Sequence, residues 1–180
     1  MIVIAAATLG CGALANTPGS HLKLESPTLA PGATVPVAQI YDRLGCHGKN
    51  ISPALRWSGA PAGTRSFAVT VFDPDAPTGA GWWHWLVYDI PPSVSELPEG
   101  AGSAGGKLPP GSVQGNNDFG SVGYGGPCPP HGEPHRYVFT LYALKTDTIE
   151  APPASGAARI GPVLDANALA KASFTPLYGR

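Results

Sequence analysis

Charged side chains are scarce in this sequence. They make up 13% of its 180 residues, where roughly 25% is usual for globular proteins, and the formal net charge is −1. Such a chain has no general field to steer it toward nucleic acid or an anionic membrane surface. We therefore expect no nucleic-acid partner, and recognition of a charged ligand has to be local.

Hydrophobic runs long enough to cross a bilayer as a helix are also lacking. The apolar stretch 1–15 is too short, and it ends in Ala13-Leu14-Ala15, a pattern typical of signal-peptidase sites. No basic segment precedes it, and Cys11 offers a lipoprotein cleavage site as an alternative. We predict a signal peptide over 1–15, a single domain over 16–180, and export to the periplasm or the medium. If residues 1–15 are not a signal, the protein is cytoplasmic.

Cysteine is rare as well, with three residues. If Cys11 leaves with the signal, Cys46 and Cys128 remain and can form a disulfide in an oxidising compartment. Two separate buried thiols are the alternative. The spacing Cys128, His131, His135 suggests a zinc site, but the intervening prolines disrupt the helix that normally presents such ligands. We therefore expect neither a metal nor a cofactor.

Glycine and proline, by contrast, are abundant, with 24 and 21 residues. They lie mostly between short runs of aromatic and β-branched residues, which is typical of a turn-rich, mainly β domain. The predicted strands are 22–25, 34–40, 54–57, 66–72, 82–90 and 136–144. A short C-terminal helix is predicted over 165–172. The long segment 99–132 is irregular, and such loops are usually functional or disordered.

The first candidate for chemistry is the motif Asp73-Pro74-Asp75-Ala76-Pro77, directly after a predicted strand. Each proline favours an extended conformation in the residue before it, so Asp73 and Asp75 should project together. Two carboxylates held this close repel each other unless a cation or a donor lies between them. A turn with capping aspartates is the alternative interpretation.

The second candidate is the run Trp82-Trp83-His84-Trp85, within a predicted strand. Strict alternation places His84 on one face with Trp82 and Leu86, and the other two tryptophans on the opposite face. The three rings form a large aromatic surface around one histidine. Core packing with a hydrogen-bonded histidine is the alternative.

The third candidate begins with the glycine-rich segment 124–130 and continues into the pair His135 and Tyr137. These two residues are two apart at the start of a strand, so they should face the same side, with Arg136 facing away. Both can donate to a phosphate oxygen, and glycine backbone amides near an anion are further donors.

Together, DPDAP, HW within a strand, and GYGGPCPPHGEPHRYVFTLYAL resemble the phosphatidylethanolamine-binding protein family, in particular its bacterial, Raf-kinase-inhibitor-like branch. The segments CHGKNISP at 46–53 and QGNNDFG at 114–120 also resemble that branch. The resemblance extends from about Leu22 to the C-terminus. It implies a two-sheet antiparallel, Greek-key-like sandwich with an anion pocket at one end.

The resemblance also implies which residues form that pocket. The principal ones are Asp73, His84, His135 and Tyr137, and the neighbouring ones are Asp75, Pro77, Trp83, Gly126 and Pro127. It further implies a cis bond between Ala76 and Pro77, and a C-terminal pair, Leu177 and Tyr178, that borders the pocket.

A phosphate-bearing ligand fits these side chains. The histidines and the tyrosine can donate to phosphate oxygens, and Asp73 or Asp75 can accept from the ammonium of phosphoethanolamine or a phospholipid headgroup. A carboxylate beside a histidine favours the charged imidazolium, so binding should weaken as pH rises above the histidine pKa values.

These residues predict a binding protein rather than an enzyme, because the sequence has no serine nucleophile elbow and no phosphate-binding P-loop. Acid–base catalysis by aspartate and histidine is one alternative. The other, implied by the resemblance, is an inhibitor of a kinase or a protease that acts through the pocket rim or a surface loop such as 99–111.

Overall fold

The computed structural model describes residues 21–152 and 155–180, so the predicted signal peptide and most of the segment before Leu22 lie outside the described residues. The fold is mainly β with one helix, as predicted. The strands are β1 Lys23–Glu25, β2 Leu55–Ser58, β3 Ser66–Asp73, β4 Trp82–Ile90, β5 Glu96–Leu97, β6 Val113–Gln114, β7 His135–Arg136, β8 Val138–Leu144, β9 Ala168–Phe174 and β10 Leu177–Tyr178. The helix is α1 Ala157–Asn167. Within the described part of the chain, no helix is long and apolar enough to cross a membrane.

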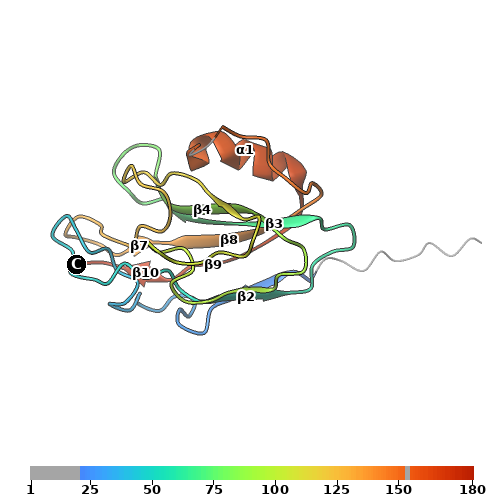
Figure 1. The fold of residues 1–180 in the computed structure, drawn as a ribbon. Helices are drawn as coiled ribbons and strands as arrows, with labels where there is room; N and C mark the ends of the chain where they lie inside the picture. The colour runs from blue at the N-terminus through green and yellow to red at the C-terminus, as the bar shows by residue number, and fades with distance from the viewer. Residues whose placement is uncertain (1–20, 153–154) are drawn as a thin grey trace, which may run out of the picture.

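Two antiparallel sheets face each other, and α1 covers the outer face of the larger one (Figure 1). The larger sheet has five strands in the order β6-β4-β3-β8-β9, and the smaller has three in the order β1-β2-β5. A short ribbon of β10 and β7 extends the molecule at one end. The predicted two-sheet architecture is confirmed, with the helix as a third layer.

Each face of the large sheet has its own core. Between the sheets lie residues such as Leu55, Val69 and Leu141, whereas Leu86 and Ile160 pack between the large sheet and α1. All five are fully buried. The central strands β3 and β8 are apolar on both faces for this reason, which matches the two-sided pattern in their sequences.

The predicted helix over 165–172 is wrong. Helix α1 ends at Asn167, and residues 168–174 form β9, which pairs with β8 along its length. Ala170 and Ala172 point toward the core while Leu169 and Lys171 are exposed, so the segment alternates with a strand period. Pairing and burial in the sheet override the helical preference of alanine and lysine.

The predicted strand over 34–40 is also absent as a strand. Thr34 makes an isolated bridge to Leu177, and the chain then turns, with the amide of Gln39 donating to the carbonyl of Pro36. A proline has no amide hydrogen to donate to a ladder, which explains why the strand does not form there.

Candidate ligand-binding pocket

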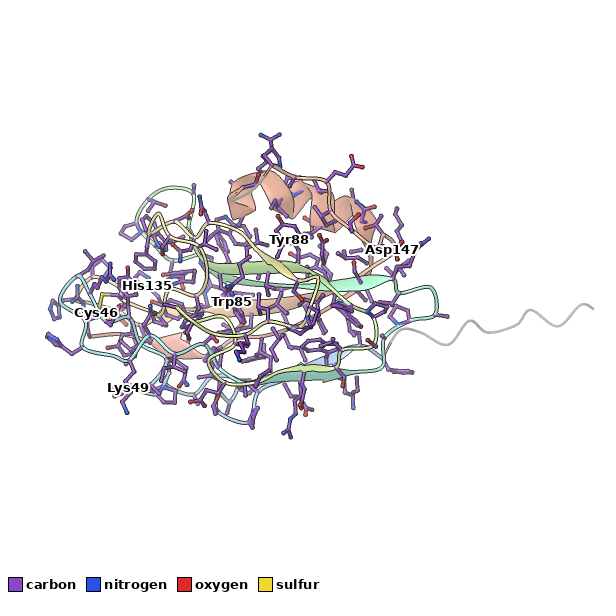
Figure 2. The ribbon with its side chains drawn as sticks, viewed as in Figure 1. Cys46, Lys49, Trp85, Tyr88, His135 and Asp147 are labelled. Carbon is purple, nitrogen blue, oxygen red and sulfur yellow. A yellow bond between two sulfur atoms is a disulfide. The ribbon has the colours of Figure 1, made fainter. Side chains whose placement is uncertain are left out.

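A pocket of about 210 Å³ opens at the end of the sandwich that carries β7 and β10. Figure 2 shows His135 and Cys46 at this end, and Asp147 at the other. The pocket is lined by Leu44, Asp73, Ala76, Pro77, Thr78, Trp82, His84, Phe119, Cys128, Pro129, Pro130, His135 and Tyr137. The four principal residues predicted from the sequence are thus brought together, from the end of β3, the start of β4 and the chain around β7.

Asp73 and His135 form a nearly buried pair. His135 Nδ1 donates to Asp73 Oδ2 at 2.7 Å, and the exposed fractions of the two side chains are 13% and 4%. The other carboxylate oxygen accepts from the amide of Asp75 at 2.8 Å. Because the carboxylate fixes the proton on Nδ1, the Nε2 atom of His135 is left for a ligand.

His84 reaches the pocket through a β-bulge. Strand β4 has one residue more than β3 between the pairs Val71–Trp85 and Phe72–Trp83, and that residue is His84. Because of the bulge, His84 and the next residue, Trp85, both face the inside of the sandwich. Strict alternation had instead predicted that Leu86 would share the face of His84, but Leu86 lies on the outer face. The prediction that His84 shares a face with Leu86 is therefore wrong.

The imidazole of His84 is buried and held by backbone. Its Nδ1 lies 2.7 Å from the carbonyl oxygen of Gly125, which can only accept, so Nδ1 carries a proton. Burial lowers the pKa of His84, although this hydrogen bond and the charge of Asp73 oppose the effect. The lowered pKa favours the neutral ring near pH 7.

Tyr137 is also among the residues that line the pocket. The side chain is fully buried, its ring meets that of His84 edge to face with centroids 5.1 Å apart, and burial raises its pKa, so the hydroxyl keeps its proton. Among the described residues this hydroxyl has no hydrogen-bond partner, and the same is true of the indole Nε1 of Trp82. Two buried donors without acceptors therefore line one pocket.

Asp75 faces a different partner from Asp73. Its carboxylate accepts two hydrogen bonds from the Arg136 guanidinium, at 2.9 and 2.7 Å, and a third from the Arg136 amide at 2.9 Å. Hydrogen bonding to Arg136 lowers the pKa of Asp75 to about 2. The two aspartates thus avoid mutual repulsion by separate pairing, and Asp75 lies beside the pocket rather than in it.

Three other predicted residues lie outside the pocket. Trp83 packs against Phe72 on the opposite face of the sheet, with ring centroids 4.4 Å apart. The amide of Gly126 donates to Asn50 Oδ1 at 2.7 Å, and the carbonyl of Pro127 accepts from Tyr41. The expected glycine donors are therefore already used, since the Gly125 amide also donates within the protein, to His84.

Two further expectations concern backbone near the pocket. The described peptide bonds are all trans, so the predicted cis bond at Ala76–Pro77 is wrong, although Pro77 does line the pocket. Leu177 and Tyr178 form β10 and pair with β7, which places Tyr178 opposite His135 in the ribbon. They support the strand that carries His135 but are not among the lining residues.

The model of the phosphatidylethanolamine-binding protein family matches residues 25–179. The chain belongs to this family. The Escherichia coli proteins YbcL and YbhB, both named UPF0098 proteins, are 51% and 44% identical to it. The YbcL alignment covers 87% of this chain and 86% of YbcL, and the YbhB alignment covers 87% and 99%.

A solved structure agrees with this membership. The crystal structure of E. coli YbcL, described as a new member of the mammalian PEBP family, superposes on this chain with a TM-score of 0.86 at 49% identity, and the match covers 88% of this chain and 98% of that one.

A further relative by sequence is a Mycobacterium tuberculosis protein named as a lipoprotein, LppC. It is 41% identical to this chain, and the alignment covers 73% of this chain and 59% of LppC.

In this member of the phosphatidylethanolamine-binding protein family a disulfide closes the pocket rim. Cys46 and Cys128 are bonded, with Cα atoms 5.9 Å apart, so the alternative of two free thiols is wrong and Cys128 is not available to zinc. Arg180 reinforces the same junction, because its Nε donates to the carbonyl of Pro129 at 2.5 Å. Within the described residues, no group of three or more histidine, cysteine or acidic side chains is arranged to hold a metal.

Sequence reasoning missed the aromatic walls of the pocket. The sequence predicts Trp83 as a pocket residue, whereas Trp82 lines the pocket, and it gives no prediction for Phe119. The ring of Phe119 stacks on Tyr41 with centroids 4.2 Å apart and meets the ring of His84 edge to face. Phe119 belongs to the QGNNDFG segment that carried the family resemblance. The motif could have identified it, but only the fold shows that its ring faces His84.

Proposed function

We propose that the pocket binds the phosphate group of a small ligand, in keeping with a family whose name refers to a phospholipid. The observation that carries this proposal is the pair of buried donors without acceptors, the Tyr137 hydroxyl and the Trp82 indole. An unpaired buried donor costs roughly 1–3 kcal/mol, which an anionic oxygen at hydrogen-bond distance would recover. His135, oriented by Asp73, offers a third polar atom.

The same residues favour binding over catalysis. The pocket lining has one aliphatic hydroxyl, on Thr78, and one cysteine sulfur, on Cys128. The Thr78 hydroxyl donates to the carbonyl of Gly81 at 2.7 Å, and Cys128 is consumed in the disulfide. Nucleophilic catalysis requires a free group beside a base, and neither of these meets the requirement.

A second function, inhibition of a kinase or a protease, would use the pocket rim. Leu44 is a large apolar side chain at this rim and is 70% exposed, as is suited to contact with a partner protein. Loss of inhibition in a Leu44→Asn variant that still binds phosphate would show that inhibition depends on the exposed rim side chain and not on phosphate binding alone.

The decisive experiment titrates the purified protein with inorganic phosphate and with phosphoethanolamine by calorimetry. Tyr137→Phe removes only the unpartnered hydroxyl, so we expect it to lower phosphate affinity about tenfold or more while leaving the melting temperature unchanged or slightly raised. The double variant His135→Ala, Tyr137→Phe should abolish binding.

Tyr124→Phe is the matched control. Tyr124 is also buried, but its hydroxyl donates to the carbonyl of Gln39 at 2.9 Å and does not line the pocket. This change should cost about 1 kcal/mol of stability and leave phosphate affinity unchanged. If the folded wild-type protein binds neither compound, the proposal is wrong.

A further inference from the structure

The carboxylates near the pocket are already engaged. Asp73 accepts from His135 with one oxygen and from the amide of Asp75 with the other. Asp75 accepts three hydrogen bonds from Arg136. An ammonium group on a ligand would have to compete with an imidazole or a guanidinium for either of these two acceptors.

The aromatic rings do not replace that partner. A cation is held well by aromatic faces that surround it. One face of the Phe119 ring is covered by the Tyr41 ring, with centroids 4.2 Å apart. The rings of Trp82 and Phe119 meet edge to face, with an angle of 68° between their planes. The two rings therefore form a wall rather than a cage.

Most of the remaining wall is apolar. It is formed by Pro77, Trp82, Phe119, Pro129 and Pro130, with Leu44 at the rim. An apolar cavity of about 150 Å³ can hold benzene, so the 210 Å³ here has room for a phosphate together with a small apolar group. Burying an ammonium against such a wall would cost free energy, whereas burying methylene groups would gain it.

Resting on the phosphate-binding function proposed above, we infer that the preferred ligand is a phosphate monoester with an apolar substituent, alkyl or aryl, rather than an ethanolamine ester. The phosphate lies against Tyr137, Trp82 and His135, and the substituent lies along the wall toward Leu44. Leu44 has a positive φ of 55°, which is unusual for a leucine, and is 70% exposed, so its backbone is held in a conformation that presents the side chain at the opening.

A matched pair of esters tests this inference. Propyl phosphate and phosphoethanolamine differ by a terminal methyl in place of the ammonium, so calorimetry on the full protein compares the two groups directly. We expect propyl phosphate to bind about fivefold more tightly or better. From methyl to butyl phosphate, affinity should rise roughly threefold per methylene group.

The rim variant Leu44→Asn should flatten the alkyl series, so that methyl and butyl phosphate bind to it about equally well, and asparagine suits the positive φ at this position. Val37→Asn is the control, because Val37 is similarly exposed at 60% but does not line the pocket. It should bind every compound as the wild type does. An alkyl series that flattens equally in both variants would contradict the inference.

Three outcomes separate the inference from the function on which it rests. Phosphoethanolamine binding as tightly as propyl phosphate overturns the inference and leaves the proposed function intact. If inorganic phosphate binds and no ester binds more tightly than it does, the inference is likewise overturned and the proposed function stands. Failure of folded protein to bind any of the phosphate compounds overturns the proposed function, and the inference with it.

Discussion

The two pocket histidines differ in the acceptor that holds Nδ1. For His135 it is the carboxylate of Asp73, and for His84 it is the carbonyl of Gly125. The pairing with Asp73 leaves Nε2 of His135 for a ligand, whereas His84 is buried more deeply. The residues therefore suit different tasks, with His135 facing an anion and His84 serving as a neutral part of the wall.

This difference predicts a pH dependence of stability. The folded state keeps His84 neutral because burial lowers its pKa, whereas the unfolded chain binds a proton near the ordinary pKa of about 6.5. Unfolding therefore takes up a proton, and the free energy of unfolding should fall from pH 7 to pH 5, by at most about 1.4 kcal/mol per pH unit. Urea unfolding at several pH values measures this slope.

His84→Gln should flatten that slope, and His47→Gln, at an exposed histidine, should not. Asp75 does not interfere in this window. Its pKa is lowered to about 2, so its contribution is complete above the unfolded value near 4 and is lost only as pH falls below it. Equal slopes in the wild type and the His84 variant would contradict the assignment.

At single positions, the sequence predicts which residue types meet but not always which neighbour faces the pocket. Asp73, His135 and Tyr137 lie where strand alternation and the family resemblance place them. Trp83 does not, since it lies on the opposite face of the sheet while Trp82 lines the pocket. The pairing of Asp75 with Arg136 joins residues 61 positions apart, and local sequence carries no signal for it.

Among the elements, β9 shows most clearly where local prediction ends. The segment 168–174 is rich in alanine, which favours a helix, yet six of its seven residues pair with β8. Its alternation of half-buried and exposed residues is visible only once the partner strand is known. Strands β3 and β4 were predictable to within one residue, because aromatic and β-branched residues leave no competing helical pattern.

The disulfide between Cys46 and Cys128 joins two loops of the pocket rim, and we expect it to affect both stability and ligand binding. Cys46 and Cys128 are 82 residues apart, and the loops that they join carry Leu44 and Pro129, which both line the pocket. A Cys46→Ser, Cys128→Ser double variant should lose about 2–4 kcal/mol of unfolding free energy because the unfolded chain gains freedom. It should also bind phosphate less tightly, since the rim is no longer held by a covalent bond.

Chemical unfolding and calorimetry on the same samples check both effects. Arg180→Ala is the comparison, because it removes the hydrogen bond to Pro129 and keeps the disulfide. We expect a smaller loss of affinity from this variant than from the double serine variant. Unchanged phosphate affinity in the double variant would show that the rim is positioned without the disulfide.

For the whole molecule, the layers separate stability from binding. The core under α1 and the core between the sheets fill the body of the domain, and the pocket lies at the end with β7 and β10 (Figure 1). Lys49, Cys46 and His135 lie toward this end, and Tyr88 lies beneath the helix (Figure 2). Changes at the rim should therefore leave the global fold intact.

We also propose that the protein is exported, because a disulfide persists best in an oxidising compartment. Expression with the native N-terminus should deliver a periplasmic protein that begins at Asn16, as measured by N-terminal sequencing. Cytoplasmic protein with Met1 retained would contradict export, and a lipid on Cys11 would contradict cleavage after Ala15.

The extra residue at His84 also separates the side-chain phase of the pocket end of β4 from that of the residues that follow Trp85. On the pocket side of the bulge, Trp82 faces inward and Trp83 outward, and on the other side Trp85 faces inward again. Deleting His84 would remove the bulge and leave regular alternation, with Trp82 and Trp85 facing inward and Trp83 outward, so the pocket would lose the imidazole while the neighbouring rings kept their faces. Length variation here thus has a large effect on ligand recognition and a small one on the core, since the stretch from Trp85 to Ile90 keeps its register.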